Sequence, residues 1–129
     1  MGVQSELLKQ RTMSFALMVL RLIENVSNTP GGQVVSRQLA KSATSVGANY
    51  RACCNARSRV EFIAKLGVVV EEIDETLYWL EVISGSRLLP PSHADPVRVE
   101  ASELRAIFAK SLGTARTNLK MSKSNDQIK

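Results

Sequence analysis

The sequence is poor in the residues that carry most enzyme and metal chemistry. It contains one histidine, His93, and two cysteines, the adjacent Cys53 and Cys54. A di-iron bundle needs inward-facing glutamates with Glu-x-x-His pairs on several helices, and His93 is predicted in a loop beside prolines. Without a histidine near a cysteine or a serine, no nucleophile and base pair can be assembled. We therefore predict a protein that is not an enzyme, with no catalytic residue, metal site or cofactor.

Long apolar runs and spaced cysteines are also missing. The most apolar stretch, residues 15–23, is short and contains Arg21, which argues against a membrane-spanning helix or a signal peptide. Two adjacent cysteines cannot form a disulfide framework, so the predicted location is the reducing cytoplasm. A redox role for Cys53 and Cys54 is the alternative to the favoured interpretation, in which they are buried packing residues near a helix end.

What the sequence does contain is a helical pattern. Apolar residues recur at three- and four-residue steps in four segments, and nowhere do they alternate for long enough to indicate a strand. The predicted helices cover about residues 12–27, 33–54 and 58–84, followed by a fourth that begins at 95, and the first has room to extend back toward Ser5. Short connections favour an all-α, antiparallel up-and-down four-helix bundle. Residues 1–120 are predicted to form this single domain and residues 121–129 a polar, disordered tail.

Local signals predict where these helices begin and end. Ser58 followed by Glu61 fits a capping box, and Gly85 is expected to end the same helix in the left-handed conformation. Asp95-Pro96 is a common helix opening, whereas Pro30-Gly31-Gly32 is expected to separate the first two helices. Gly47, inside the second helix, predicts a close approach to another backbone. The predicted inward-facing residues are Ala16, Val19, Leu20, Ile23 and Val26; Val35, Leu39, Val46, Tyr50 and Cys53; Phe62, Leu66, Val69, Ile73, Leu77 and Leu80; and Val97, Ala101, Leu104, Phe108, Leu112 and Ala115.

Positive charge is concentrated in the first half of the chain. The formal net charge is +5, yet residues 1–59 contain eight basic and two acidic residues, and residues 60–89 contain two basic and six acidic residues. A basic stripe on the outward side of the second helix, continued just beyond its end, could follow a phosphate backbone. An ordinary solvated face explains the stripe equally well. The candidate nucleic-acid-binding residues are Arg37, Lys41, Arg51, Arg57 and Arg59.

The third helix carries a second apolar face opposite its core stripe. A helix with two apolar faces usually has two partners, so this face is predicted to contact a neighbouring subunit, with its acidic residues pairing to a basic helix. The alternative is that this helix lies deeper in the monomer than its neighbours. The candidate interface residues are Ala64, Val68, Glu71, Tyr78 and Val82.

Three strings within residues 11–118 resemble the family of 23S rRNA intervening-sequence proteins. They are SATSVGANYR at 42–51, ARSRVEFIAKLG at 56–67 and EEIDETLYWLE at 71–81. The resemblance implies a bacterial four-helix bundle that assembles as a homopentamer, binds nucleic acid in a poorly defined role and has no catalytic residues. A related branch is the accessory protein of diversity-generating retroelements, which works with a reverse transcriptase and RNA.

Inside these strings the resemblance supports the basic positions Arg51, Arg57 and Arg59, with Lys65 as an addition. Relatives commonly place an acidic residue soon after the Tyr-Arg pair, where this chain has Ala52 and the two cysteines. The predicted function is an oligomeric bundle that binds RNA or DNA backbones with little sequence readout, because no base-reading element is found. The alternative is a protein-interaction scaffold or an accessory subunit for a partner such as a reverse transcriptase.

Overall fold

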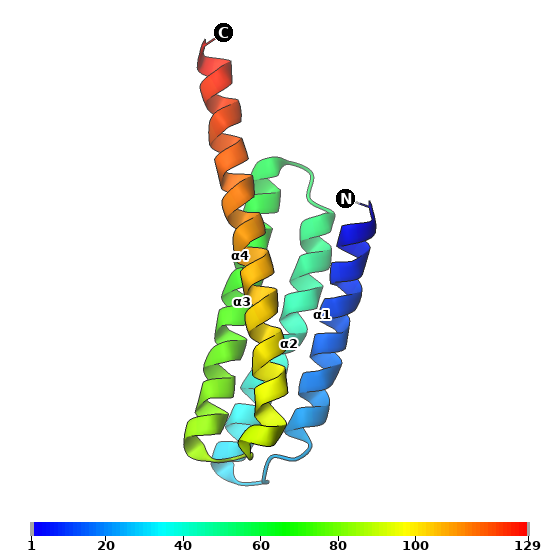
Figure 1. Ribbon diagram of the computed structural model, residues 1–129, viewed down its shortest axis with the longest axis vertical. Coiled ribbons are helices and arrows are strands. Elements are labelled where there is room, and N and C mark those ends of the chain that lie inside the picture. The colour runs from blue at the N-terminus through cyan, green and yellow to red at the C-terminus, as the bar shows by residue number, and fades with distance from the viewer. Residues whose placement is uncertain (1, 129) are drawn as a thin grey trace.

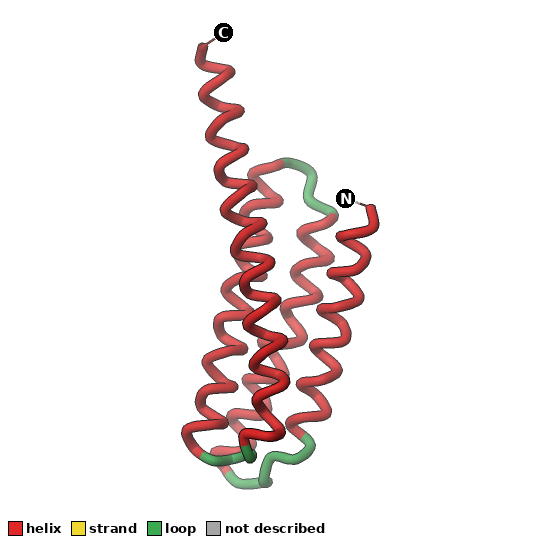
Figure 2. The backbone as a smooth tube through the Cα atoms, in the orientation of Figure 1, coloured by secondary structure: helices red, strands yellow, loops and turns green. Residues whose placement is uncertain are grey.

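The chain forms four long helices arranged as a bundle (Figure 1). The computed structural model describes residues 2–128, in the order α1 (Gly2–Ile23), α2 (Pro30–Cys54), α3 (Arg59–Ser86) and α4 (Pro91–Ile128). Successive helices run antiparallel and are joined by short turns (Figure 2). The α2–α3 contact is the most extensive and the α1–α4 contact the least. The predicted all-α, up-and-down four-helix bundle is confirmed.

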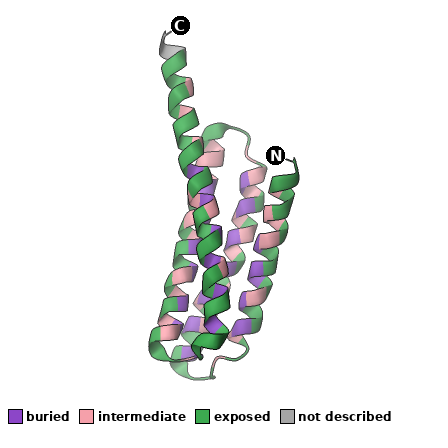
Figure 3. Cartoon of the chain, in the orientation of Figure 1, coloured by how far each residue is buried: buried purple, intermediate pink, exposed green. Residues whose placement is uncertain are grey.

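Buried residues line the space between the helices (Figure 3). All five residues predicted to point inward from α2 are buried, and so are Leu66, Val69, Ile73 and Leu80 of α3. Two predictions were wrong in detail, because Leu20 is 39% exposed and the fully buried Phe15 was not included. Residues of intermediate burial at the edge of the core are Ile23, Val26, Phe62, Leu77 and Ala115.

Small hydroxyl residues let α2 and α3 pack closely. Ser42 and Ala43 of α2 are fully buried, as is Thr76 of α3. The Thr76 hydroxyl donates to the Ser42 hydroxyl oxygen across the contact at 3.0 Å. A buried hydroxyl costs free energy unless it is hydrogen-bonded, so this pair satisfies both groups within the α2–α3 contact.

The predicted start of α2 was wrong by three residues. Thr29 is the N-cap, since its hydroxyl oxygen accepts a hydrogen bond from the Gly32 N–H at 3.0 Å, and Pro30 is the first helical residue. Proline suits this position because its missing N–H would have no partner inside the helix. A Cβ on Gly32 would lie 2.1 Å from the Ser27 carbonyl oxygen, so only glycine fits here.

Gly32→Ala is therefore expected to lower the free energy of unfolding by about 1–3 kcal/mol, since the backbone must move to relieve the overlap. Gly31→Ala is the matched control, because a Cβ at Gly31 meets no atom within 4 Å. Chemical denaturation of both variants measures the difference. Equal midpoints for the two variants would contradict this account of the turn.

The ends of α3 and α4 also differ in part from the predictions. The Glu61 N–H donates to the Ser58 hydroxyl oxygen at 3.1 Å, which confirms Ser58 as the N-cap of α3. Arg87, at φ 59°, and not Gly85, adopts the left-handed conformation that ends α3. Helix α4 begins at Pro91, so Pro96 lies inside the helix and His93 in its first turn, not in a loop.

The last part of α4 projects beyond the other three helices (Figure 1). The helix continues to Ile128, so the predicted boundary at residue 120 does not coincide with a helix end, and residue 129 of the predicted tail lies outside the described residues. Asn118 still lines a cleft together with Phe62 and Ile63 of α3, and the residues from 116 to 125 are exposed apart from Leu119 and Ser122.

Ion pairs join α1 to α4, where helix packing is least extensive. The Arg11 guanidinium donates to both carboxylate oxygens of Glu100, at 2.8 and 2.7 Å, and to Glu103 at 2.7 Å. These hydrogen bonds raise the pKa of Arg11, chiefly through Glu100. Bidentate geometry makes this pair stronger than an ordinary surface ion pair.

Within residues 2–128, no helix is both long and apolar enough to cross a membrane.

Candidate functional site

The predicted basic stripe is exposed along α2. Arg37, Lys41 and Arg51 are all exposed, and Arg51 lies fourteen residues after Arg37, which corresponds to about 21 Å of helix. Within the described part of the chain, none of these three side chains lies within ion-pair distance of a carboxylate. Burial raises the pKa of Glu72 on α3, and the positive charge of Lys41 opposes this effect in part.

Arg57 and Arg59 lie at the turn between α2 and α3. Both are exposed, and among the described residues Arg57 lies 3.9 Å from the Glu61 carboxylate whereas Arg59 has no carboxylate within ion-pair distance. A cleft of about 390 Å³ lies beside them and reaches α4, where Ala115 and Asn118 form its wall. The turn and the start of the projecting part of α4 therefore share one end of the molecule (Figure 1).

The projecting part of α4 adds basic residues that were not predicted. Arg116, Lys120 and Lys123 are exposed, and their spacing of four and three residues places them on one face of the helix. The spacing is visible in the sequence, but it indicates a shared helix face only if α4 continues past residue 120. We call the combined set the basic end, which consists of Arg57, Arg59, Arg116, Lys120 and Lys123.

An apolar groove lies between α1 and α2. Its volume is about 530 Å³, and Met13 and Leu17 of α1 line it while remaining 47% and 43% exposed. Lys9 and Arg51 are its charged members. The stripe prediction was therefore incomplete, because Arg51 borders an apolar groove and not a wholly solvated ridge. The α1–α2 groove consists of Lys9, Thr12, Met13, Ala16, Leu17, Leu20, Thr44, Gly47, Ala48 and Arg51.

Gly47 brings the two walls of this groove together. A Cβ at Gly47 would lie 3.1 Å from the Thr12 hydroxyl oxygen and 3.6 Å from the Thr12 carbonyl carbon. Thr12 is fully buried at this point of α1. The predicted close approach of Gly47 to another backbone is confirmed, and it explains a glycine in a helix interior.

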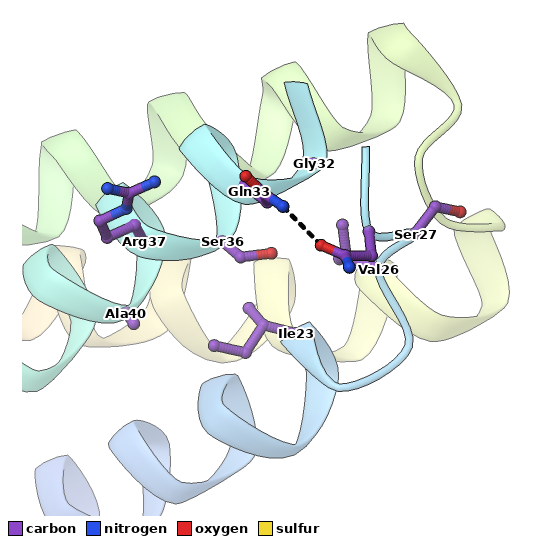
Figure 4. Close-up of a pocket in the computed structure, with 9 residues that line it drawn as sticks. Ile23, Val26, Ser27, Gly32, Gln33, Ser36, Arg37 and Ala40 are labelled. Carbon is purple, nitrogen blue, oxygen red and sulfur yellow. Dashed lines mark hydrogen bonds between the residues drawn. The ribbon is translucent and has the colours of Figure 1, made fainter. Parts of the chain in front are cut away.

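A second pocket lies at the other end of the α1–α2 contact (Figure 4). Ile23 of α1 lies opposite Ser36 and Ala40 of α2, and Arg37 lies at the far end from Val26 and Ser27. Gln33 donates to the Asn28 side-chain oxygen at 2.6 Å at its edge. This hydrogen bond pairs two of the polar side chains that line the pocket.

The outer face of α3 is exposed, as the interface prediction required. Tyr78 is 56% exposed, and Ala64, Val68 and Glu71 are also exposed. Val82 was predicted in the same set but is half-buried and packs against the core. The alternative, that α3 lies deeper in the monomer, is contradicted for this face.

The cysteines lie in packing positions. Cys53 is fully buried and its thiol donates to the Phe62 carbonyl oxygen at 3.6 Å. Burial raises the pKa of the Cys53 thiol to about 11 and also raises the pKa of the neighbouring Tyr50 hydroxyl. Within residues 2–128, no three His, Cys, Asp or Glu side chains come close enough to hold a metal ion.

We expect Cys53 to react with iodoacetamide far more slowly than Cys54 at pH 8, because the thiolate is the nucleophile and Cys53 remains a buried thiol. The rate at Cys53 should rise with pH until the pH passes about 11. Cys54→Ala and Cys53→Ala variants isolate each thiol for mass spectrometry. Similar rates in the two folded variants would contradict the packing role.

Comparison with known proteins adds two findings. The family model described as "23S rRNA-intervening sequence protein" matches residues 6–110. A crystal structure from Bacteroides thetaiotaomicron, described as a protein with unknown function from the S23 ribosomal protein family, is 27% identical to this chain. The match has a TM-score of 0.78 and covers 86% of this chain and 99% of the other. No curated protein sequence matches the chain.

Proposed function

Because the chain belongs to the 23S rRNA-intervening sequence protein family, we propose that it is a non-enzymatic, homo-oligomeric protein that binds RNA or DNA backbones. The resemblance to this family makes a homopentamer the expected assembly. The proposal takes the basic end as the principal contact with phosphate groups and Arg37 and Lys41 as further exposed cations nearer the start of α2.

One observation carries this proposal: exposed cations gather at one end of the bundle with almost no carboxylates to neutralise them. Within the described residues, the only ion pair made by the basic end is the 3.9 Å contact between Arg57 and Glu61, and Lys65 competes for the same carboxylate at 3.8 Å. Such a surface attracts polyanions and gains free energy when it releases their condensed counterions.

The arrangement favours backbone contacts over base recognition. Arg59 stands at the start of α3 and Arg116 on the side of α4, so the cations belong to different elements around a cleft. Phosphate contacts from arginine and lysine position a nucleic acid but carry no sequence information. We therefore expect similar affinity for unrelated sequences.

A protein-interaction scaffold is the second candidate function. The α1–α2 groove and the outer face of α3 are both apolar and exposed, which is unusual for a monomer that binds only nucleic acid. A reverse transcriptase is one partner that the resemblance to the family suggests. Under this hypothesis, salt would affect partner binding but labelled nucleic acid would not bind.

The test is the affinity of the protein for labelled RNA and duplex DNA at 50 mM salt, measured by fluorescence anisotropy. The double variant Arg57→Glu/Arg59→Glu is expected to bind about 100-fold more weakly, because each lost phosphate contact costs roughly tenfold at this salt concentration. Arg98→Glu is the matched control, since Arg98 is exposed near the opposite end of α4 and pairs with Asp95. Wild-type affinity in the double variant would contradict the proposed binding surface.

A further inference from the structure

Two exposed apolar surfaces of the protomer differ in charge. The α1–α2 groove carries Arg51 and Lys9, and of these only Lys9 has an ion-pair partner among the described residues, Glu6 at 3.3 Å. The outer face of α3 carries Glu71 and Glu75, both exposed and neither in an ion pair within residues 2–128. The two surfaces are therefore complementary in charge and alike in their apolar content.

The two surfaces are also complementary in shape. The groove is concave, whereas α3 presents the convex side of a helix. Ala64, Gly67 and Val68 have small side chains in the N-terminal half of this face, so that the backbone of α3 could come close to a partner there.

Gly67 has no explanation within one protomer. Glycine in a helix interior costs about 1 kcal/mol relative to alanine. Gly47 offsets that cost through its contact with Thr12, whereas a Cβ at Gly67 would meet no atom within 4 Å. The space above Gly67 is open on the same face as Ala64 and Val68, which is where a second helix would approach.

We propose that the outer face of α3 in one copy docks into the α1–α2 groove of the next copy, with Glu71 and Glu75 facing Arg51. The two faces are different surfaces of the protomer, so this contact is head-to-tail and builds a ring when the rotation between copies closes. The inference rests on the proposed homo-oligomer. It assigns Arg51 to the contact between copies and leaves the basic end free for nucleic acid.

The first test is a steric block, followed by native mass spectrometry and light scattering of the full chain without nucleic acid. Gly67→Leu is expected to convert the oligomer to a 14.2 kDa monomer, because the new side chain enters the docking space from a Cβ position that meets no atom of its own protomer within 4 Å. Gly113→Leu is the matched control, since Gly113 lies within α4 and also has no atom within 4 Å of a Cβ. The control should keep the wild-type mass, and circular dichroism verifies that both variants fold.

The second test is a charge swap. Arg51→Glu and Glu71→Arg are each expected to raise the dissociation constant of the assembly at least about tenfold, and the double variant to recover part of that loss, because opposite charges again face each other. If Gly67→Leu dissociates the assembly but Arg51→Glu does not, α3 meets a surface other than the groove, and the inference is overturned.

The remaining outcomes separate this inference from the proposed function. A wild-type oligomer that neither Gly67→Leu nor Arg51→Glu alters overturns only the pairing of these two surfaces. A wild-type monomer at micromolar concentration overturns both the pairing and the proposed assembly. Nucleic-acid binding is measured in a separate assay through Arg57 and Arg59, so its failure would leave the docking result standing.

Discussion

Phe108→Ala is expected to lower the free energy of unfolding by about 3–5 kcal/mol. Phe108 is only 1% exposed, and its ring centroid lies 5.2 Å from that of Tyr50. The truncation would remove a large buried surface and this aromatic contact between α4 and α2, and a close-packed core refills such a cavity only in part. This is the largest stability effect that we expect from a single core substitution.

Chemical denaturation at a fixed protein concentration measures this loss, because self-association would otherwise add a concentration-dependent contribution. Val99→Ala is the control on the same helix, since Val99 is 58% exposed and its truncation should change stability by no more than about 0.5 kcal/mol. If the two variants unfold at the same denaturant concentration, Phe108 does not have the core role described above.

The helical repeat was sufficient to predict most of this core. Val35, Leu39 and Val46 of α2 recur at helical spacing with polar residues between them, so burial on one side was the only consistent arrangement. Helix α1 was harder, because Leu17 and Leu20 are as apolar as the buried Val19. Periodicity does not reveal which of two apolar sides faces the core when a helix carries both.

Helix ends were less predictable, since they depend on contacts that a local motif does not contain. Glycine adopts the left-handed conformation more easily than arginine does, so Gly85 was the expected end of α3. The helix instead ends at Arg87, after which the Leu88 N–H donates to the Ile83 carbonyl oxygen at 3.2 Å. Pro96 resembles a helix start because of Asp95 before it. Helix α4 instead begins five residues earlier, at Pro91. It can include Pro96 because a proline near a helix start removes only one backbone hydrogen bond.

The candidate surfaces, too, could be predicted from the sequence only in part. The exposure of Arg37, Lys41, Arg51, Arg57 and Arg59 followed from their position opposite the apolar stripe and in the turn after it. The α1–α2 groove could not be predicted in this way, because it depends on the tilt between two helices. The basic row of α4 required knowing that this helix continues beyond the bundle.

Nucleic-acid affinity is expected to fall steeply with salt. A protein that neutralises Z phosphates on duplex DNA shows a slope of about −0.9Z in a plot of log affinity against log salt concentration. The five cations of the basic end then predict a slope near −4.5, which is roughly a 500-fold loss of affinity between 50 and 200 mM salt. Arg57→Glu/Arg59→Glu should reduce the magnitude of the slope by about two.

The most direct test of the proposed function is this pair of affinities, measured for wild-type protein and labelled duplex DNA at 50 and 200 mM salt. We predict binding at the lower concentration and a loss of roughly 500-fold at the higher one. Duplex DNA that stays unbound at 50 mM salt, or an affinity that is the same at both concentrations, would contradict the proposal that the basic end binds phosphate backbones.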